Sequence, residues 1–333
     1  MTGNSPEFEL AGVGSPIVDL TAQVPDSFLA HVSGEKGGMV LVDDAEMARI
    51  LSKLATPPSL SSGGSAANTA FNAARLGLRT TFVGKLGNDA LARAYVERFT
   101  AAGVDASRFK HGTVANARCL AMVTPDAQRT MRTNLGAAMT LSPAEVSPAD
   151  FKGVSHAHIE GYLVFNEALC DAVLAAARAA GCTISLDLSS FEVVNAKRDW
   201  MFRQFGHGID VVFANEDEIR ALYPEKKGGF ESLARELATH DVVAAVKMGR
   251  DGAWIGKGDE IHRIAPVHIH DVIDTNGAGD AWAAGFLFGY IRGRPLGECG
   301  AMASVMGAET VRHLGPLIPD SVWEEVKLRA LKV

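Results

Sequence analysis

Short β-rich runs alternate with longer helical patterns along most of the chain, and this alternation is the strongest constraint on its fold. The expected strands are Glu9–Val13, Thr80–Val83, Val154–Ile159, Thr183–Leu188, Asp210–Phe213 and Val242–Lys247. The expected helices are Ser65–Leu76, Asp89–Ala102 and Glu167–Ala180, each followed by a glycine (Gly77, Gly103 and Gly181). Strands that alternate with helices usually pair in parallel and are covered on both faces. The pattern therefore predicts an α/β fold with a central, mostly parallel sheet.

Two stretches interrupt this alternation. Apolar runs at Ile17–Val24 and Met39–Val42 flank a glycine-rich segment, and Ala117–Thr124 and Arg129–Leu135 have the pattern of a hairpin that turns at Pro125 and Asp126. The pattern alone is equally compatible with a small separate sheet and with edge strands of the main sheet.

Composition excludes several classes of protein. The chain has 333 residues, of which 47% are hydrophobic and 21% charged, so it can bury a large core as one unit. Its formal net charge of −7 argues against non-specific binding to nucleic acid. No apolar run approaches the roughly 20 residues of a membrane span, so we expect no membrane partner. The first residues lack the pattern of a signal peptide, and we expect a cytoplasmic protein.

The four cysteines and the paired histidines are expected to be structural. Cys119, Cys170, Cys182 and Cys299 are scattered without metal-ligand spacing, as is usual for reduced thiols. His156 and His158 lie two residues apart on an expected strand, but no third ligand is apparent. We therefore expect no metal site at these histidines.

The strongest chemical signal is the run Asp274-Thr275-Asn276-Gly277-Ala278-Gly279-Asp280, which an apolar helical stretch follows directly. Such a turn leaves backbone N–H groups free at a helix N-terminus, where they can converge on an anion. Asp280 falls in the first helical turn and should stay ionised beside the positive helix end. It could accept the proton of a substrate hydroxyl while the N–H groups stabilise a transferring phosphoryl group. The alternative is a glycine-rich loop with an acidic first turn, which is common.

A second glycine-rich helix start lies near the N-terminus. Gly63, Gly64 and Ser65 precede Asn68, whose amide could bind a polyol from the first helical turn. The alternative is a flexible loop and a solvated asparagine. The chain has no GxxxxGK[ST] loop and no protein-kinase signature set, so a phosphate-handling enzyme would need another anion site.

Together, the two motifs resemble the two signatures of the ribokinase (PfkB-type carbohydrate kinase) family. The first signature corresponds to the segment from Gly63 to Gly77 and the second to that from Asp274 to Asp280, and their order also matches. The resemblance covers roughly Glu9 to Gly315. It implies a ribokinase-like three-layer fold in which residues 1–333 form one kinase unit. A small β lid would comprise about residues 15–60 and 110–137, with the core formed by the remainder.

Within that family, the chain looks most like the adenosine kinase branch. Gly14–Asp19, Arg129–Ala137 and Ile159–Tyr162 resemble segments of that branch, but Ser15 stands where relatives often have asparagine. The resemblance implies ATP-dependent phosphorylation of a primary hydroxyl of a nucleoside, with adenosine converted to AMP. Ile17, Val18 and Leu20 beside Asp19 are expected to offer an apolar surface for the base, and Tyr162 a ring for stacking.

Other functions remain open at this point. The first alternative is a sugar or sugar-acid kinase of the same family, acting on ribose, fructose or 2-keto-3-deoxygluconate. The second is a nucleoside-binding protein without catalysis, which an intact Asp280 argues against. A Rossmann dehydrogenase is disfavoured because no GxGxxG follows the first strand. The oligomeric state could be monomer or homodimer.

The resemblance also implies roles for individual residues. The catalytic residues would be the base Asp280, the anion turn of Gly277, Ala278 and Gly279, and the phosphoryl-neutralising Arg129. Substrate-binding residues would be Asp19, Gly63, Gly64, Ser65, Asn68, Glu160 and Tyr162. The nucleotide side would comprise Asn215, Glu218, Lys247, Gly249, Arg250 and Gly252. Glu218 would hold Mg²⁺ through water, and Asp274 is similar to a position linked to a monovalent cation such as K⁺.

Each of these roles has a structural alternative. Asp19 could be a strand-end turn residue, and Asn215 and Glu218 a helix cap with its first-turn acid. Arg129 and Arg132 could be solvated hairpin charges. Gly249 and Arg250 could form a plain hairpin turn.

Overall fold

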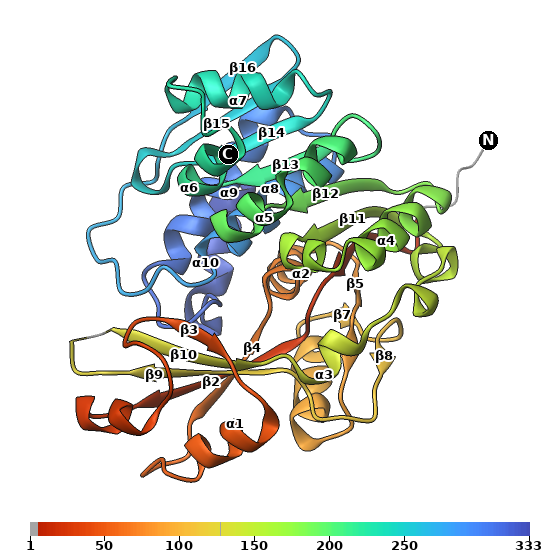
Figure 1. The fold of residues 1–333 in the computed structure, drawn as a ribbon. Coiled ribbons are helices and arrows are strands. Elements are labelled where there is room, and N and C mark those ends of the chain that lie inside the picture. The colour runs from red at the N-terminus through yellow and green to blue at the C-terminus, as the bar shows by residue number, and fades with distance from the viewer. Residues whose placement is uncertain (1–5, 127) are drawn as a thin grey trace.

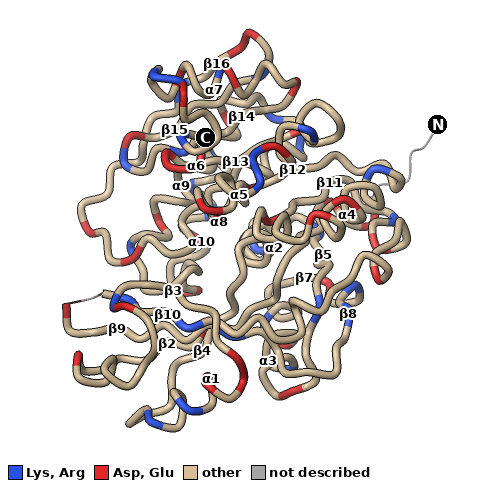
Figure 2. Tube along the Cα trace, viewed as in Figure 1, with Lys and Arg blue, Asp and Glu red and all other residues tan. Residues whose placement is uncertain are grey.

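The computed structural model describes residues 6–126 and 128–333, which form a large α/β body and a smaller β body (Figure 1). No helix of these two ranges has the length and apolar character needed to cross a bilayer. Basic and acidic residues are interspersed over both bodies (Figure 2).

A nine-stranded sheet forms the centre of the large body, in the order β16-β15-β14-β13-β12-β11-β1-β5-β7. Its strands are β1 (Phe8–Val13), β5 (Thr80–Val83), β7 (Val104–Asp105), β11 (Val154–Glu160), β12 (Thr183–Asp187), β13 (Val211–Ala214), β14 (Val243–Lys247), β15 (Ala253–Lys257) and β16 (Glu260–Ile264). Pairing is parallel from β7 to β14, and β15 and β16 add an antiparallel edge. The expected mostly parallel sheet is confirmed, although the sequence pattern did not reveal the edge.

Helices cover both faces of this sheet and complete three layers. One face packs against α4 (Glu167–Ala179), α5 (Phe191–Gln204), α6 (Glu216–Leu222) and α7 (Phe230–Ala238). The other packs against α2 (Ser65–Leu76), α8 (Ala278–Ile291) and α9 (Leu296–Thr310), with α10 (Asp320–Leu331) behind α9. The buried strands are rich in Val, Ile and Ala because both of their faces lie under helices.

The interrupting stretches form a separate five-stranded sheet, ordered β3-β10-β9-β2-β4. Its strands are β2 (Ile17–Gln23), β3 (Met39–Leu41), β4 (Ser59–Gly63), β9 (Arg118–Val123) and β10 (Arg129–Asn134). The structure thus resolves the open question in favour of a small sheet. Lys110 and His111 lie outside it, in a short ladder between β6 (Lys85–Leu86) and β8 (Lys110–His111). The remaining helices are α1 (Asp44–Leu51) and α3 (Ala90–Ala101). Both pack against the small sheet, and their apolar side chains share one buried cluster with Val18 and Leu20 of β2.

Strand alternation gives the small sheet two different faces. Val18 and Leu20 are each 4% exposed and pack into the core behind β2, whereas Asp19 and Thr21 point to the other face. The expectation that Val18 and Leu20 flank Asp19 with apolar surface is therefore wrong, because neighbours on a strand point in opposite directions.

Buried polar side chains fix the connections between the two bodies. The Glu160 carboxylate, at the end of β11, accepts hydrogen bonds from the backbone N–H of Ser15 at 2.8 Å and of Ala66 at 3.3 Å. Asn116, which is fully buried, donates to the carbonyl oxygen of Pro16 and accepts from the N–H of Gly87. Three of the chain crossings between the bodies are therefore held by hydrogen bonds.

Candidate active site

The glycine-rich run before α8 forms the expected turn at a helix N-terminus. Gly277 is the N-cap, and its φ of 73° lies in the left-handed region that favours glycine. The next N–H groups, in the first turn, have no intrahelical carbonyl to bind. The Ala278 N–H donates to the carbonyl oxygen of Thr275 at 3.3 Å, so an anion placed at this half-buried turn would meet the N–H groups that follow and the positive end of a 14-residue helix.

Asp280 lies in this first turn and is held by the first turn of α2. Ser65 Oγ donates to its Oδ1 at 2.8 Å, and Asn68 Nδ2 donates to its Oδ2 at 2.9 Å. The residues predicted to bind substrate hydroxyls thus orient the predicted base in this structure. They do so because α2 and α8 both begin at the same end of the large sheet.

Burial raises the pKa of Asp280 to about 6, although the hydrogen bonds from Asn68 and Ser65 lower it. The negative charge of Asp187 adds to the increase, and the positive charge of Lys247 opposes it. The sequence argument considered only the helix end, which favours ionisation; in the structure desolvation is the larger effect. A carboxylate with this pKa is ionised at neutral pH and is still basic enough to take up a proton.

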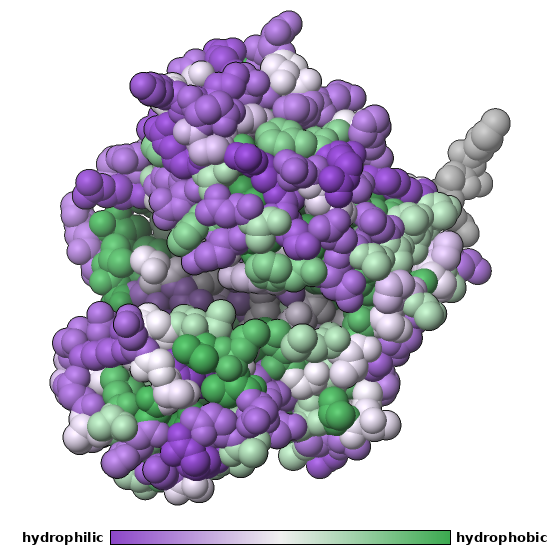
Figure 3. Space-filling view, in the orientation of Figure 1, coloured by the Kyte–Doolittle hydropathy of each residue, from purple (hydrophilic) through white to green (hydrophobic). Residues whose placement is uncertain are grey.

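A cavity of about 630 Å³ separates the small sheet from Asp274, Thr275 and Asn276, which precede the glycines of the turn, and from the segment after α9. In the space-filling view, the surface of the molecule is hollowed between the two bodies (Figure 3). The polar residues that line the cavity are Asp19, Thr21, Ser59, Ser61, Arg75, Arg98, Cys119, Arg129, Asp274, Thr275, Asn276 and Asp320. Its apolar lining is Phe71, Ala121, Met131, Leu314, Pro316, Leu317, Ile318 and Pro319, with Gly315 completing the wall.

Asp19 faces this cavity from the centre of the small sheet. Burial raises its pKa to about 7, and the charge of Asp280 adds to the shift, while Arg129 lowers it. Gly63 makes room for the carboxylate, because a Cβ on Gly63 would overlap with Asp19 Oδ2. Asp19 is therefore a cavity residue in the middle of β2, and the strand-end alternative is wrong.

Arg129 reaches across the cavity to the large body. Its guanidinium forms an ion pair with the Asp274 carboxylate, which also accepts from the N–H of Gly315 at 2.7 Å and of Asn276 at 3.0 Å. Three donors thus contact Asp274, and the predicted binding of a K⁺ ion at this residue stays a prediction. Arg132 is fully buried and donates to the carbonyl oxygens of Gly38 and Ser33. Neither arginine is the solvated hairpin charge that the alternative supposed.

Of the predicted substrate-binding residues only Asp19 lines the cavity, whereas Gly63, Gly64, Ser65, Asn68, Glu160 and Tyr162 do not. Glu160 is 2% exposed and lies at the crossing between the bodies, where backbone donors occupy its carboxylate. Tyr162 is 47% exposed, and its Oη lies 3.4 Å from the carbonyl oxygen of Ser189. Neither is therefore in a position to stack on or bind a ligand in the cavity as the structure stands. Gly64 forms the N-cap of α2.

The predicted nucleotide side lies at the carboxyl ends of β13 and β14. Asn215 and Glu218 form a capping box, in which the Glu218 N–H donates to Asn215 Oδ1 at 2.9 Å and the Asn215 N–H donates to Glu218 Oε2 at 2.8 Å. Burial raises the pKa of Glu218 to about 7, and the nearby charge of Asp187 adds to this shift. The structure therefore contains the helix cap that the structural alternative for Asn215 and Glu218 supposed. In addition, the carboxylate of Glu218 is buried close to the negative charge of Asp187.

Lys247 and Asp187 form an ion pair that the sequence reasoning identified only in part. Lys247 Nζ donates to Asp187 Oδ2 at 3.0 Å, and both side chains are nearly buried. Asp187 was missed, although it is an acidic residue that directly ends an apolar strand. In parallel sheets, such strand-end positions are where ligands bind.

The other predicted nucleotide residues lie in an exposed turn. Gly249, Arg250 and Gly252 join β14 to β15, so they form the hairpin turn of the alternative, and their nucleotide contact stays a prediction. His156 and His158 are buried and lie 2.8 Å from Ser185 Oγ. Within the described residues, no group of three or more His, Cys, Asp or Glu side chains could hold a metal ion. All four cysteines are free thiols.

Comparison with known proteins identifies the family. The model of the pfkB family of carbohydrate kinases matches residues 40–322. This chain belongs to the pfkB carbohydrate kinase family.

Individual relatives agree on kinase activity but differ in acceptor. The crystal structure of an adenosine kinase from Sinorhizobium meliloti is 32% identical, with a TM-score of 0.84 over 97% of this chain and 99% of that one. A probable sugar kinase from Rhizobium etli CFN 42 is also 32% identical, with a TM-score of 0.85 over 98% and 99%. A nucleoside kinase from Methanothermobacter thermautotrophicus is 31% identical over 78% of this chain and 82% of its own length. The chain is therefore a kinase with a small-molecule acceptor, and membership of the family implies use of ATP.

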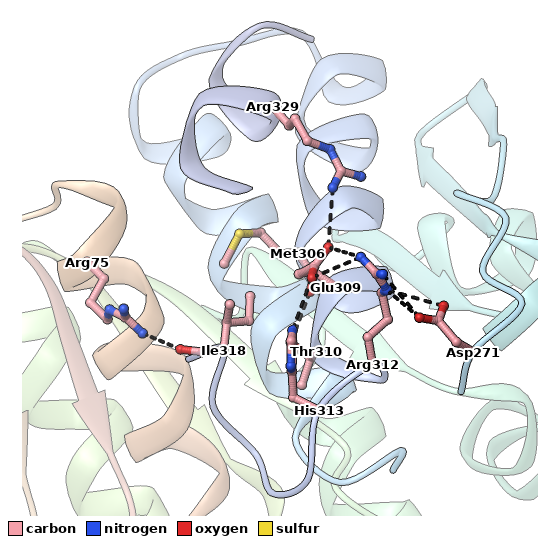
Figure 4. Close-up of polar contacts among 9 residues, drawn as sticks. All are labelled: Arg75, Asp271, Met306, Glu309, Thr310, Arg312, His313, Ile318 and Arg329. Carbon is pink, nitrogen blue, oxygen red and sulfur yellow. Dashed lines mark hydrogen bonds and ion pairs between the residues drawn. The ribbon is translucent and has the colours of Figure 1, made fainter. Parts of the chain in front are cut away.

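A buried acid, Glu309, lies near the end of α9, just before the segment that lines the cavity opposite the small sheet. Its carboxylate lies 3.0 Å from His313 Nε2 and accepts from Arg312 at 3.3 Å and Arg329 at 3.2 Å (Figure 4). Arg312 also donates to Asp271, in the segment that leads to the anion turn. Glu309 thereby connects the end of α9, helix α10 and the approach to the turn.

We expect Asp280→Asn to remove phosphoryl transfer and keep the fold, since asparagine preserves the shape of the side chain but cannot accept the proton. Loss of a general base typically lowers kcat by about 10²–10⁴-fold. In the wild type, kcat/KM should fall as the pH drops below about 6, because protonation of Asp280 removes the base. Asp259→Asn, in the exposed turn between β15 and β16, is the matched control. Near wild-type kcat in a folded Asp280→Asn protein would contradict the assignment.

We expect Glu309→Gln to destabilise the fold, because the amide removes the negative charge and places a donor against the guanidinium groups of Arg312 and Arg329, which can only donate. Loss of a hydrogen-bonded charge of this kind costs about 1.5–3 kcal/mol in the free energy of unfolding. The control is Glu298→Gln, which breaks an exposed pair with Arg294 and should cost about 0–1 kcal/mol. Urea unfolding of both variants measures the difference. Equal shifts would show that Glu309 contributes no more than a surface charge.

Proposed function

We propose that this kinase transfers the γ-phosphoryl group of ATP to a primary hydroxyl of a nucleoside, with adenosine as the preferred acceptor. The observation that supports this most is the composition of the cavity. A single carboxylate, Asp19, faces it from the small sheet, while Met131, Leu314 and Phe71 line it with apolar side chains. A nucleoside has this same division into a polar ribose and an apolar base.

The volume and lining of the cavity fit such a ligand. Pockets for small ligands usually occupy about 300–1,000 Å³ and combine apolar walls with a few polar groups. Asp19 would accept hydrogen bonds from ribose hydroxyls, and its neighbours on the same face, Ser61 on β4 and Cys119 on β9, leave room beside it. The apolar surface comes from β9, β10 and the segment after α9, not from Val18 and Leu20.

In the proposed reaction the acceptor hydroxyl attacks the γ-phosphorus. The new bond joins the acceptor oxygen to phosphorus, the bond from the γ-phosphorus to the β–γ bridging oxygen breaks, and the hydroxyl proton passes to Asp280. The N–H groups of the turn from Gly277 to Gly279 would stabilise the charge that develops on the phosphoryl oxygens. Arg129 would leave Asp274 and approach the same group when the small sheet closes over the cavity.

The acids at the strand ends fit a magnesium ion. Glu218 and Asp187 lie near one another, and their mutual repulsion contributes to the raised pKa of Glu218. A divalent cation held through water by Glu218 would relieve this repulsion and would neutralise phosphate charge when bound.

One observation favours a second candidate, a sugar-acid kinase. Arg75 and Arg98 line the cavity along with the hydroxyl groups of Thr21, Ser59 and Ser61. The two guanidinium groups could bind a carboxylate, and the hydroxyl groups could bind a polyol. Arg75, however, already donates to the carbonyl oxygen of Ile318 and to Asp320, both at 2.6 Å.

An acceptor panel separates the two candidates. We expect kcat/KM with Mg-ATP to be higher for adenosine than for inosine, ribose, fructose or 2-keto-3-deoxygluconate. Met131→Asp should lower kcat/KM for adenosine because it places a charge against the base, and Met139→Asp, at an exposed position outside the cavity, is the control. If a sugar or sugar acid exceeds adenosine by about tenfold, which corresponds to about 1.4 kcal/mol in transition-state binding, the nucleoside proposal fails.

Acceptor binding should also slow hydrogen exchange in the small sheet. Closure of the sheet over the cavity would exclude water from the reacting groups. We expect slower exchange in residues 17–42, 59–63 and 118–123 with acceptor bound, and no change in buried α9, which serves as an internal reference. Unchanged protection of the small sheet at saturating acceptor would indicate a rigid site.

A further inference from the structure

The ammonium group of Lys247 lies over the anion turn. A Cβ built on Gly279 would be 3.3 Å from Lys247 Nζ. Lys247 ends β14, and Asp187, which accepts one of its hydrogen bonds, ends β12, two strands away across β13. The long side chain therefore leaves its own strand and is fixed above the second glycine of the turn.

The surroundings of Lys247 keep it charged. Burial lowers the pKa of this ammonium, but the negative charges of Asp187, Glu218 and Asp280 outweigh that effect, and the pKa ends above its usual value. An ammonium has three N–H donors, and Asp187 takes one of them. Donors thus remain for an anion on the turn.

The position of Lys247 differs from that expected of a contact to the nucleoside part of ATP. Such a contact would use the exposed turn from Gly249 to Gly252, which begins two residues later in the chain. The side chain instead points toward Gly279, where the N–H groups would bind the phosphoryl group in flight. A cation at that point opposes the charge that develops on the phosphoryl oxygens.

We propose that Lys247 is a catalytic cation that contacts the transferring phosphoryl group, and that Asp187 is the positioning residue that holds its ammonium over Gly279. This inference rests on the proposed phosphoryl transfer. Lys247 forms and breaks no covalent bond and keeps its proton throughout, while Asp280 takes the proton of the acceptor hydroxyl. Asp187 does not touch the reacting atoms.

Kinetics of Lys247→Met test the catalytic role. We expect kcat to fall by about 10²–10³-fold, as on removal of other transition-state donors, with little change in KM for ATP or the acceptor. Lys257→Met, at the exposed end of β15, is the control and should behave as the wild type. A normal kcat with a raised KM for ATP would make Lys247 a ground-state nucleotide contact and overturn the proposal.

The pH profile adds a second readout. The charged groups near Asp280 include Lys247, Asp187, Asp19 and Glu160, and Arg129 acts on the neighbouring Asp19. Removal of the Lys247 cation, which lowers the pKa of Asp280, should raise that pKa, so the acid limb of kcat/KM should move to higher pH in Lys247→Met. Lys247→Arg should restore the limb. A limb that stays in place in the methionine variant would contradict the predicted proximity of the two groups.

Further variants test the role of Asp187 and separate slow catalysis from faulty folding. Lys247→Met leaves Asp187 buried without a partner, so the double variant Asp187→Asn/Lys247→Met provides a form without this unpaired charge. It should be as slow as the single lysine variant. Asp187→Asn alone should lower kcat less than Lys247→Met, with Asp187→Glu as a conservative rescue. A double variant with wild-type kcat would show that the pair is structural.

A transition-state mimic separates this inference from the choice of acceptor. Binding of MgADP with aluminium fluoride reports on the phosphoryl site without any turnover. Lys247→Met should bind this complex about 10²–10³-fold more weakly than the wild type, with unchanged affinity for MgADP alone. If no acceptor in the panel is phosphorylated but this difference appears, the proposed acceptor is wrong and the role of Lys247 stands. Equal affinity of both proteins for the mimic would refute the role.

Discussion

The carboxylate of Asp280 joins the first turns of two helices, and the geometry of the site depends on this contact. Ser65 Oγ and Asn68 Nδ2, on α2, each bind one of its oxygens, although they are more than 200 residues away in the chain. Helix α2 begins where the small sheet returns to the large body, and α8 begins at the anion turn. The contact therefore fixes the position of α2, which follows the small sheet, relative to the anion turn at the start of α8.

A second buried carboxylate connects this contact to the crossings between the bodies. Ala66, the residue after Ser65, donates its N–H to Glu160, and the same carboxylate accepts from Ser15 at the start of the small sheet. Consecutive residues of α2 thus hold the base and the hinge. If the small sheet closes as proposed, we expect movement about Ser15 to be transmitted through Glu160 and Ala66 to Ser65, which contacts Asp280. Glu160 thus connects Ser15 to Ala66 and does not contact the cavity, in agreement with its burial.

Local sequence patterns predicted the layers of the fold and the location of the turn, because both depend on short-range features. Alternation between strands and helices is visible within short windows over most of the chain, and Gly277 and Gly279 can be recognised without tertiary structure. The polar strand β4, Ser59–Gly63, was missed because its pairing with β2 overrides a weak strand propensity. Val18 and Leu20 were placed on the wrong face because the argument counted neighbours of Asp19 without applying strand alternation.

The partners of individual charges could not be predicted in the same way. Nothing near Arg129 in the sequence indicates that it meets Asp274, and nothing near Lys247 indicates that it leaves its strand to meet Asp187. These pairs depend on the distances between strand ends and between the two sheets. Asp187 could have been found from its place at the end of a buried parallel strand, where a charged side chain is tolerated only at an edge that meets solvent or ligand.

The balance of charges at the strand ends indicates how a polyphosphate can enter a protein whose net charge is −7. Burial raises the pKa of Asp19, Glu160 and Glu218 to about 7, and the negative charges of Asp280 and Asp187 add to the shift, so these acids are partly protonated at neutral pH. A free polyphosphate would disfavour their ionised forms further, whereas a magnesium complex brings a cation that favours them. The N–H groups of the turn are neutral donors, and they remain available for the phosphoryl group. We therefore expect the site to favour the magnesium complex over the free polyphosphate, because only the complex compensates the acids near the turn.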